Sequence, residues 1–565
     1  MRRGIKNETV QNLGGAPIPV DRRRLNITFW LVNLGLVSFL VFFNDAPVPL
    51  ERLGFSLLLV AAIMLPTWLW VSGRSHGLPI YPLYCLSFFP TYAMPLCRGD
   101  SRFAQYTELQ IANGVMTVAG YLFLTTFVWL QCTNRNLKPT PYVREIDPRR
   151  PNLMIFLLST GLIFEVIGIY LGESKGGAYQ AIRGYAQNAS RLAIFILFFQ
   201  IGKKELSPFR VALVMAMSLA LVVRQAASIV LANSFPILGL CFAGFFMGSG
   251  KVPWKSLAAV VGVIVLLHSG KAEMRSIYYK EGVTVTLADY PGFFAEWMVR
   301  GVTGLTKGES SEGVQVQNAK ERAALLPLLL QIQQMTGTEV PYLDGVSYEK
   351  IPSMLVPRII TKDKAVSHIS NMILAVHYGI LTMENVFFTS IAFDFVIEAY
   401  ANFGYGGVAG LAVLMGLFLG LITLGTTGVP LFSFRFLLGI IVLSAVVGSN
   451  NTMGVFVTTS WQGFLALVTM AYTIMKKTDN VLYVKPGMGA RKMGDGRLEM
   501  GYGISDMGDR ETEDRGLRTE GGPTSLQASP TREELRRVEN EAEPEAAPAK
   551  HERPTRFVYG QKKKD

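Results

Sequence analysis

Apolar runs occupy most of this chain, and many are long enough for a helix to cross the roughly 30 Å hydrocarbon core of a bilayer. Half of the residues are apolar and only 17% are charged, which is unusual for a soluble domain. The pattern predicts an all-α polytopic membrane protein. We expect about twelve transmembrane helices, at residues 25–43, 53–71, 78–95, 111–131, 153–171, 188–202, 211–223, 228–247, 256–268, 404–424, 434–448 and 454–475. The third segment contains Pro82, Pro90 and Pro95, which is compatible with a re-entrant span.

Basic residues cluster at the ends of these segments. When the predicted spans alternate across the membrane, the clusters fall on one side, which the positive-inside rule identifies as the cytoplasm. They comprise Arg22, Arg23, Arg24, Arg135, Lys138, Arg144, Arg149, Arg150, Lys203, Lys204, Lys251, Lys255, Lys476 and Lys477. Membrane topology therefore explains much of the net charge of +12. No aromatic-rich soluble module accompanies these residues, so we expect no nucleic-acid binding.

The predicted organisation has five parts. Residues 1–24 form a cytoplasmic tail, residues 25–268 contain nine spans, residues 269–403 form a large extracytoplasmic loop, and residues 404–475 contain three more spans. Apolar stretches with helical spacing, such as residues 319–335, predict that the loop folds as a helical cap on the membrane surface. Residues 476–565 are polar and rich in glycine, so we expect a disordered cytoplasmic tail.

Metal and nucleotide sites find no support in the sequence. Cys85, Cys97, Cys132 and Cys241 are scattered, and the five histidines form no metal-binding pattern. Two glycine-rich segments, residues 248–256 and 487–496, lack the spacing of phosphate-binding loops. We therefore expect no metal and no nucleotide cofactor.

Ionisable residues are concentrated late in the predicted loop, although such groups are costly to hold near a bilayer. Asp394, Glu398 and Asn402 follow Ser390 at intervals of four, which predicts one polar face of a helix. The same spacing relates two basic pairs, Lys364 with His368 and Lys271 with Arg275. We expect these faces to border one external cavity. The alternative is that Asp394 and Glu398 form the solvated face of a surface helix, and that Lys271 and Arg275 form ion pairs.

Short motifs in this region resemble those of Wzy-type oligosaccharide repeat unit polymerases, the O-antigen polymerase family. They are a turn with Gly345, Ser347 and Tyr348, a segment with Pro357, Arg358 and Lys364, and a helix end with Glu398, Tyr400, Asn402, Phe403 and Gly404. Arg224 resembles the arginine that follows the middle spans of this family. The resemblance is loose over residues 151–475 and specific over residues 345–410. Ala365 stands where the family commonly has proline.

The resemblance implies a fold similar to the GT-C-like glycosyltransferases that use lipid carriers. It also implies an activity, which is the transfer of a glycan from one polyprenyl diphosphate to the sugar hydroxyl of a second lipid-linked repeat unit. The implied location is the cytoplasmic (inner) membrane of a bacterium, with the active site on its outer face. A flippase and a chain-length regulator of the same pathway are the implied partners, and no metal or other cofactor is implied.

Under this resemblance, cations bind the donor diphosphate and a base accepts the proton of the attacking hydroxyl. Arginine suits the first role because its guanidinium contacts phosphate oxygens through two parallel bonds. The candidates for the diphosphate are Arg224, Lys271, Arg275, Arg358 and Lys364; those for the base are Glu398, with Asp394 and His368 as rivals; and those for sugar contacts or their support are Tyr348, Tyr400, Asn402 and Arg183. The alternatives are interfacial anchoring for the tyrosines and a solvated loop charge for Arg183.

One acidic residue, Glu165, lies within the fifth predicted span. Pairing with a buried arginine is expected, and a structural ion pair is its simplest explanation. Two other functions remain open. A ligase would use the same donor but a lipid or protein acceptor. A transporter or flippase would place charges along a path inside the spans and contain internal repeats, whereas most of the charge here is gathered in one loop.

Overall fold

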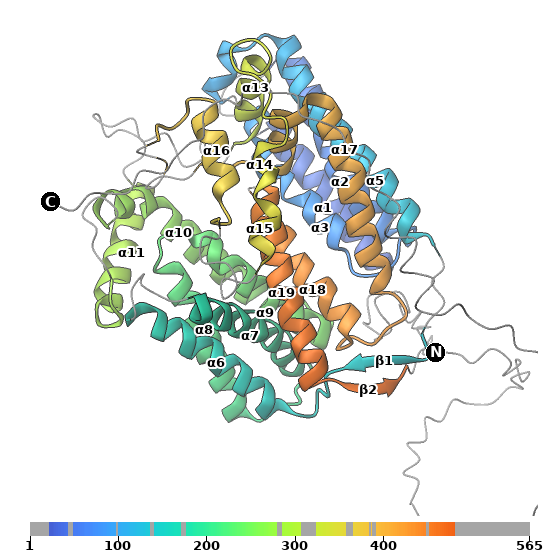
Figure 1. Ribbon diagram of the computed structural model, residues 1–565, viewed down its shortest axis with the longest axis vertical. Coiled ribbons are helices and arrows are strands. Elements are labelled where there is room, and N and C mark those ends of the chain that lie inside the picture. Colours follow the sequence, from blue (N-terminus) through green and yellow to red (C-terminus); the bar gives the residue numbers. More distant parts are fainter. Residues whose placement is uncertain are drawn as a thin grey trace, which may run out of the picture. The chain divides into compact units, whose positions relative to one another are not determined.

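The structure is a computed structural model that describes residues 22–42, 49–97, 100–135, 140–170, 177–278, 285–306, 324–356, 365–383, 386, 391–447 and 451–480. The chain divides into two units, Met1–Gly489 and Ala490–Asp565. All of the described residues belong to the first unit, and they are predominantly helical (Figure 1).

Among the described residues, eight helices are long and apolar enough to cross a membrane, and each largely coincides with one predicted span. They are α1 (Arg22–Phe42), α2 (Leu50–Val71), α5 (Glu108–Thr133), α6 (Pro151–Tyr170), α8 (Pro208–Ala226), α10 (Trp254–Tyr278), α17 (Phe395–Gly425) and α19 (Met453–Thr473). Three further predicted spans correspond to α7 (Gly177–Lys203) and to the shorter apolar helices α9 (Phe235–Ser249) and α18 (Phe434–Val446). The protein is thus a helical membrane protein.

The third predicted span is broken. It consists of α3 (Ile80–Leu86), the π-helical turn η1 (Phe89–Ala93) and α4 (Met94–Cys97). Its three prolines have no backbone N–H and interrupt regular helical hydrogen bonding. Buried aromatic rings fill the surrounding space: Phe88 stacks on Tyr92 with centroids 5.4 Å apart, and the hydroxyl oxygens of Tyr84 and Tyr121 lie 3.0 Å apart. The broken segment therefore carries its tyrosines into the core of the helix bundle.

Helices α5 and α17 are far apart in sequence but lie side by side (Figure 1). Glycines on α17 permit this approach, because a Cβ added at Gly416 would lie 2.7 Å from Cβ of Val128, and one added at Gly420 would lie 2.6 Å from Cβ of Cys132. Small residues of this kind are common where membrane helices pack closely. The two helices therefore pack closely along the second half of α17.

A kink interrupts α17 at Phe403 and Gly404. Gly404 has φ +60° and ψ −148°, a conformation that is essentially restricted to glycine. Gly404→Ala is expected to lower the free energy of unfolding by about 1–3 kcal/mol, because the new Cβ would also lie 3.2 Å from the hydroxyl oxygen of Tyr342. The measurement is thermal unfolding of the purified protein in detergent.

Gly410→Ala is the matched control for this prediction. Gly410 lies on the same helix, and a Cβ added there meets nothing within 4 Å. Alanine is favoured over glycine in a helix by roughly 0.5–1 kcal/mol, so this variant should be as stable as the parent or more stable. Equal melting temperatures for the two variants would contradict the requirement for glycine at the kink.

A two-stranded antiparallel sheet departs from the all-α prediction. Strand β1 (Tyr142–Glu145) pairs with β2 (Lys476–Asp479), with Tyr142 opposite Asp479. Arg144 donates to the carbonyl of Ala471, and the Lys477 ammonium lies 4.3 Å from the ring centroid of Tyr142. Strands of four residues carry too little periodicity to be recognised in a sequence. Their pairing joins two segments that are separated in the sequence by most of the helices.

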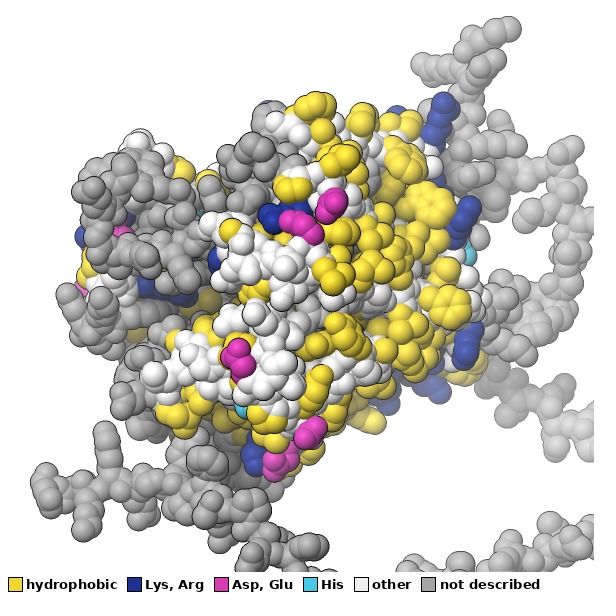
Figure 2. Space-filling model, turned by 90° about the horizontal axis from the view of Figure 1, so that it is seen from above, with side chains coloured by type: hydrophobic (Ala, Val, Ile, Leu, Met, Phe, Trp, Pro, Cys, Tyr) yellow, Lys and Arg dark blue, Asp and Glu magenta, His cyan; other side chains and the backbone are white. Residues whose placement is uncertain are grey.

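The remaining described elements lie between these helices along the chain. They are η2 (Ser101–Gln105), η3 (Leu231–Ser234), η4 (Leu287–Asp289), α11 (Tyr290–Thr306), α13 (Leu326–Met335), α14 (Val346–Glu349), α15 (Ile351–Leu355) and α16 (Ile369–His377). Figure 2 views the molecule from the end where α13 lies, and shows isolated acidic side chains beside broad apolar areas. Helix α11 packs against α10, where Ser269 Oγ donates to the carbonyl of Gly301 at 2.7 Å.

Candidate functional site

A buried carboxylate surrounded by arginines and glutamines lies near the end of α6. Glu165 is 1% exposed. Its carboxylate accepts hydrogen bonds from Arg183 Nη2 at 3.0 Å, from Gln225 Nε2 at 3.2 Å and from Gln187 Nε2, and Arg224 Nε lies 3.9 Å away. We call these residues, together with Arg191, the Glu165 cluster. The expected pairing of Glu165 with an arginine is confirmed.

Helices α7 and α8 supply the partners of Glu165. Arg183, Gln187 and Arg191 are four residues apart on α7, so they lie on one face of that helix. Arg224 and Gln225 lie in the last turn of α8. Because α6, α7 and α8 run alternately up and down the bundle, the cluster lies at the end opposite Arg150, Lys203 and Arg210, which are at the other ends of these helices.

Arg183 belongs to α7 and donates to Glu165, so the alternative of a solvated loop charge for Arg183 is wrong. The helix begins at Gly177, earlier than the apolar segment indicated, because its first turns are polar and only their packing on α6 stabilises them. Arg191 is a residue that the sequence analysis missed. It interacts electrostatically with Glu165, and its spacing of four from Gln187 and eight from Arg183 is the signal by which it could have been found.

Positive charge exceeds negative charge in the Glu165 cluster. Three guanidinium groups, on Arg183, Arg191 and Arg224, face the single carboxylate of Glu165. Charges held in an apolar bundle are costly unless they are paired, so the surplus favours binding of an anion. The side chains of Arg183 and Arg224 are 23% and 22% exposed. Both side chains are therefore only partly buried, and the Nε atoms of both have no hydrogen-bond partner among the described residues.

Two other predicted cations lie on the last turns of α10. Lys271 and Arg275 are both partly buried. Met274, between them, is fully buried in a small hydrophobic cluster that also contains Ala226 of α8 and Trp297 of α11. The structure therefore brings the end of α10 to the same end of the bundle as the end of α8, which carries Arg224.

Glu398, predicted as a catalytic base, is completely buried near the start of α17. Its Oε1 accepts a hydrogen bond from Ser347 Oγ at 2.9 Å, and its Oε2 accepts one from the backbone N–H of Met453 at 2.6 Å. Asn402, one turn further on, is also completely buried and donates to Ser347 Oγ at 2.8 Å. The interpretation of Glu398 as the solvated face of a surface helix is therefore wrong, because the side chain faces inward.

Asp394 does not share a helix face with Glu398, which corrects the predicted acidic stripe. Asp394 is the N-cap of α17, with extended backbone, and its carboxylate accepts from the N–H of Ile397 at 2.8 Å. It also accepts from the hydroxyl of Tyr92 at 2.5 Å. An aspartate at this position satisfies an orphan N–H of the first turn. Ser390, the first member of the predicted stripe, lies outside the described residues.

His368, the third candidate base, is exposed and is the N-cap of α16. In the first turn of α16, Ser370 Oγ donates to the carbonyl of Ser347 at 2.9 Å. Helix α16 is therefore attached to Ser347, which also contacts Glu398. Among the three candidate bases, His368 is the one with an exposed side chain.

The two candidate tyrosines contact aromatic rings at and next to the α17 kink. The ring of Tyr348 stacks on that of Phe403 with centroids 6.4 Å apart, and burial together with the nearby Glu398 raises the Tyr348 pKa. The ring of Tyr400 meets that of Tyr405 edge to face at 5.1 Å. These contacts favour a packing role for both rings.

Arg358 and Lys364 lie outside the described residues. The chain before them ends at α15, where the carbonyl of Leu355 accepts from Trp461 Nε1 of α19 at 2.9 Å. Their predicted contact with a diphosphate stays a prediction.

Helix α19 contacts both the chain just before α16, near His368, and α7, which carries Arg183. A Cβ added at Gly454 would lie 3.2 Å from the carbonyl oxygen of Ser367, and one added at Gly184 of α7 would lie 3.9 Å from Oε1 of Gln462. Gly454 and Gln462 are eight residues apart, or about 12 Å along a helix with a rise of roughly 1.5 Å per residue. The start of α16, which carries His368, and the first half of α7, which carries Arg183, therefore both contact α19, at points about 12 Å apart along it.

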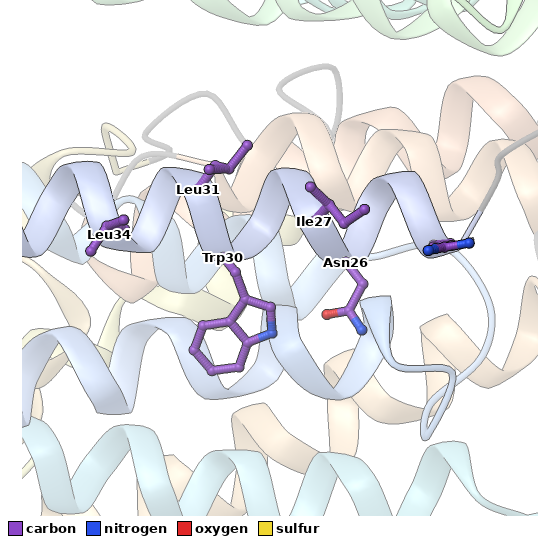
Figure 3. Close-up of a pocket in the computed structure, with 6 residues that line it drawn as sticks. Asn26, Ile27, Trp30, Leu31 and Leu34 are labelled. Atoms are coloured by element: carbon purple, nitrogen blue, oxygen red, sulfur yellow. The ribbon is translucent and has the colours of Figure 1, made fainter.

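In the part of the chain that the structure describes, no group of three or more His, Cys, Asp or Glu side chains could hold a metal ion. The four cysteines are buried and free. A groove of about 470 Å³ lies on α1, lined by Arg23, Asn26, Ile27, Trp30, Leu31 and Leu34 (Figure 3). All six residues belong to this one exposed helix, so the groove is part of the apolar outer surface.

Comparison with known proteins provides no relative for this chain. No protein-family model, no curated protein and no solved structure matches it. The chemistry of the described side chains therefore has to support any assignment of function.

Proposed function

We propose that the protein is a membrane glycosyltransferase that polymerises polyprenyl-diphosphate-linked oligosaccharide repeat units. The observation that supports this most strongly is the Glu165 cluster, in which three arginines and one carboxylate lie at one end of an apolar bundle. A lipid-linked diphosphate has both properties that such a site selects, because its head is a strong anion and its tail is apolar.

In the proposed reaction, Arg183 and Arg224 bind the diphosphate of the donor, with Arg191 contributing further positive charge. The acceptor hydroxyl attacks the anomeric carbon of the donor sugar. The bond between that carbon and the diphosphate oxygen breaks, and its electron pair leaves with the diphosphate. The guanidiniums stabilise the negative charge that develops on this leaving group. Lys271 and Arg275, at the same end of the bundle, add to the positive potential.

A base must accept the proton of the acceptor hydroxyl, and we assign this role to His368. Its imidazole is exposed and can meet a sugar that arrives from outside the bundle. Glu398 and Asp394 are poor candidates because both are buried and their oxygens already accept hydrogen bonds within the protein. Glu398 is therefore closed off from a substrate in the described structure, because its side chain is completely buried.

The test is transfer by the purified protein. Lipid-linked repeat units, extracted from cells that lack this protein, are incubated with it in detergent. Polymerisation yields lipid-linked chains of two or more repeat units and releases polyprenyl diphosphate. Release of carrier only after a separate lipid or peptide acceptor is added would identify a ligase. Movement of the donor across vesicles with no new glycosidic bond would identify a transporter, and would refute the proposal.

A further inference from the structure

Three segments that are distant in sequence meet at the carboxylate of Glu398. It joins α17 to Ser347 of α14 and to Met453, the first residue of α19. The chain also contributes Asn402, whose Nδ2 donates to Ser347 Oγ and whose Oδ1 accepts from the N–H of Gly345 at 3.0 Å. Glu398, Ser347 and Asn402 are all 0% exposed.

Glu398 acts as the missing cap of α19. The first N–H groups of a helix have no partner within it, and Thr452, the N-cap of α19, makes no side-chain hydrogen bond to them. The Glu398 carboxylate accepts from the N–H of Met453 instead. A negative charge at this end of a helix is also stabilised by the helix dipole.

The loop before α14 is attached to the kink of α17. The N–H of Leu343 donates to the carbonyl of Ala401 at 3.0 Å, and the N–H of Asp344 donates to that of Asn402 at 3.3 Å. The kink at the next two residues, which Gly404 permits, gives these carbonyls partners outside the helix. The residues of α17 just before the kink thus bind the turn that carries Ser347 through backbone and side-chain hydrogen bonds.

The position of this turn also affects the position of His368, because the turn is bonded to α16. The carbonyl of Ser347 accepts from Ser370 of α16, and Ser367 is next to Gly454 of α19. We infer that Glu398 is a positioning residue, which holds the α16 end carrying His368 at a set place relative to α19 and to the arginines of α7. This inference rests on the proposed function, because it concerns the base of that reaction.

The geometry separates this role from that of a base. Both oxygens of Glu398 accept hydrogen bonds. In Glu398→Gln, the amide oxygen can still accept from Met453, and the amide nitrogen can donate to Ser347 Oγ once that hydroxyl rotates. The connection survives without a charge, whereas an amide cannot take a proton from a substrate. Glu398→Ala removes both hydrogen bonds.

The experiment measures kcat and KM for the lipid-linked donor in Glu398→Gln, Glu398→Ala and Asp100→Asn. Asp100 is a matched control, because its carboxylate also accepts a backbone N–H at a helix start, that of Arg102. We expect Glu398→Gln to retain kcat to within about tenfold and Asp100→Asn to match the parent. Glu398→Ala should lose about 100-fold in kcat, the effect of a misplacement near 1 Å, with KM changed by less than about threefold.

Combination with His368→Ala supplies a readout that simple loss of stability would not change. If Glu398 acts through His368, the double variant should be no slower than His368→Ala alone. Glu398→Gln as inactive as Glu398→Ala would overturn the inference and restore Glu398 as the base. Fully additive losses in the double variant would overturn it in favour of a purely structural role. Absence of transfer by the parent protein would instead refute the proposed function.

Discussion

Arg224→Ala is expected to lower the rate of glycan transfer by about 10²–10³-fold, or roughly 3–4 kcal/mol in the transition state. The Arg224 side chain is partly exposed, and its Nε lies 3.9 Å from Glu165, which is too far for a hydrogen bond. Glu165 keeps its hydrogen bonds to Arg183, Gln187 and Gln225 when Arg224 is removed. The loss should therefore reflect the missing contact with the diphosphate rather than damage to the fold. The measurement is release of polyprenyl diphosphate by the purified variant.

Arg224→Lys keeps the charge but removes the planar fork that contacts two phosphate oxygens, so its activity should fall between those of the parent and of Arg224→Ala. Arg183→Ala is less informative alone, because it removes a hydrogen-bond partner from buried Glu165. Combining it with Glu165→Gln removes the unpaired charge, and transfer should remain low in the double variant. Recovery of transfer there, or parental activity in Arg224→Ala, would show that the cluster is only structural.

His368→Ala is expected to lower kcat by about 10²–10⁴-fold, the usual contribution of a positioned acid or base. The side chain is exposed and lies at the N-cap of α16, and no hydrogen bond to it is needed to explain the packing of that helix. The fold should therefore tolerate the change. The measurement is the steady-state rate of transfer with saturating donor.

His377→Ala is the matched control for this prediction. His377 is the last residue of α16 and is partly buried, and its Nε2 lies 2.9 Å from the carbonyl oxygen of Pro341. It is at the other end of the same helix, so its loss should leave transfer within about twofold of the parent, as for most surface substitutions. Equal activity of the two histidine variants would remove His368 from the reaction.

The sequence indicated some residues of the Glu165 cluster and of the contacts around Glu398, and it did not indicate others. Glu165 stood out because charge is rare in apolar spans, whereas Arg224 was a candidate because it resembles an arginine of the polymerase family. Arg191 was overlooked because its segment looked like an ordinary span, and its partner Glu165 belongs to another helix. The spacing of Asp394 and Glu398 was read as one polar face, but the helix begins at Phe395 and Asp394 caps it. An N-cap residue and a residue within the helix can both lie four positions before Glu398, so spacing in the sequence does not distinguish them.

The sequence by itself determined that this is a helical membrane protein and where most of its apolar helices lie. Length and hydrophobicity are properties of one segment, and the bilayer requires them of each spanning helix separately. Only the tertiary structure decided that Glu398 caps α19 from the side of α17, and that arginines of α7 and α8 surround a glutamate of α6. The partner of a buried charge depends on which helices pack together, and no local pattern in the chain contains that information.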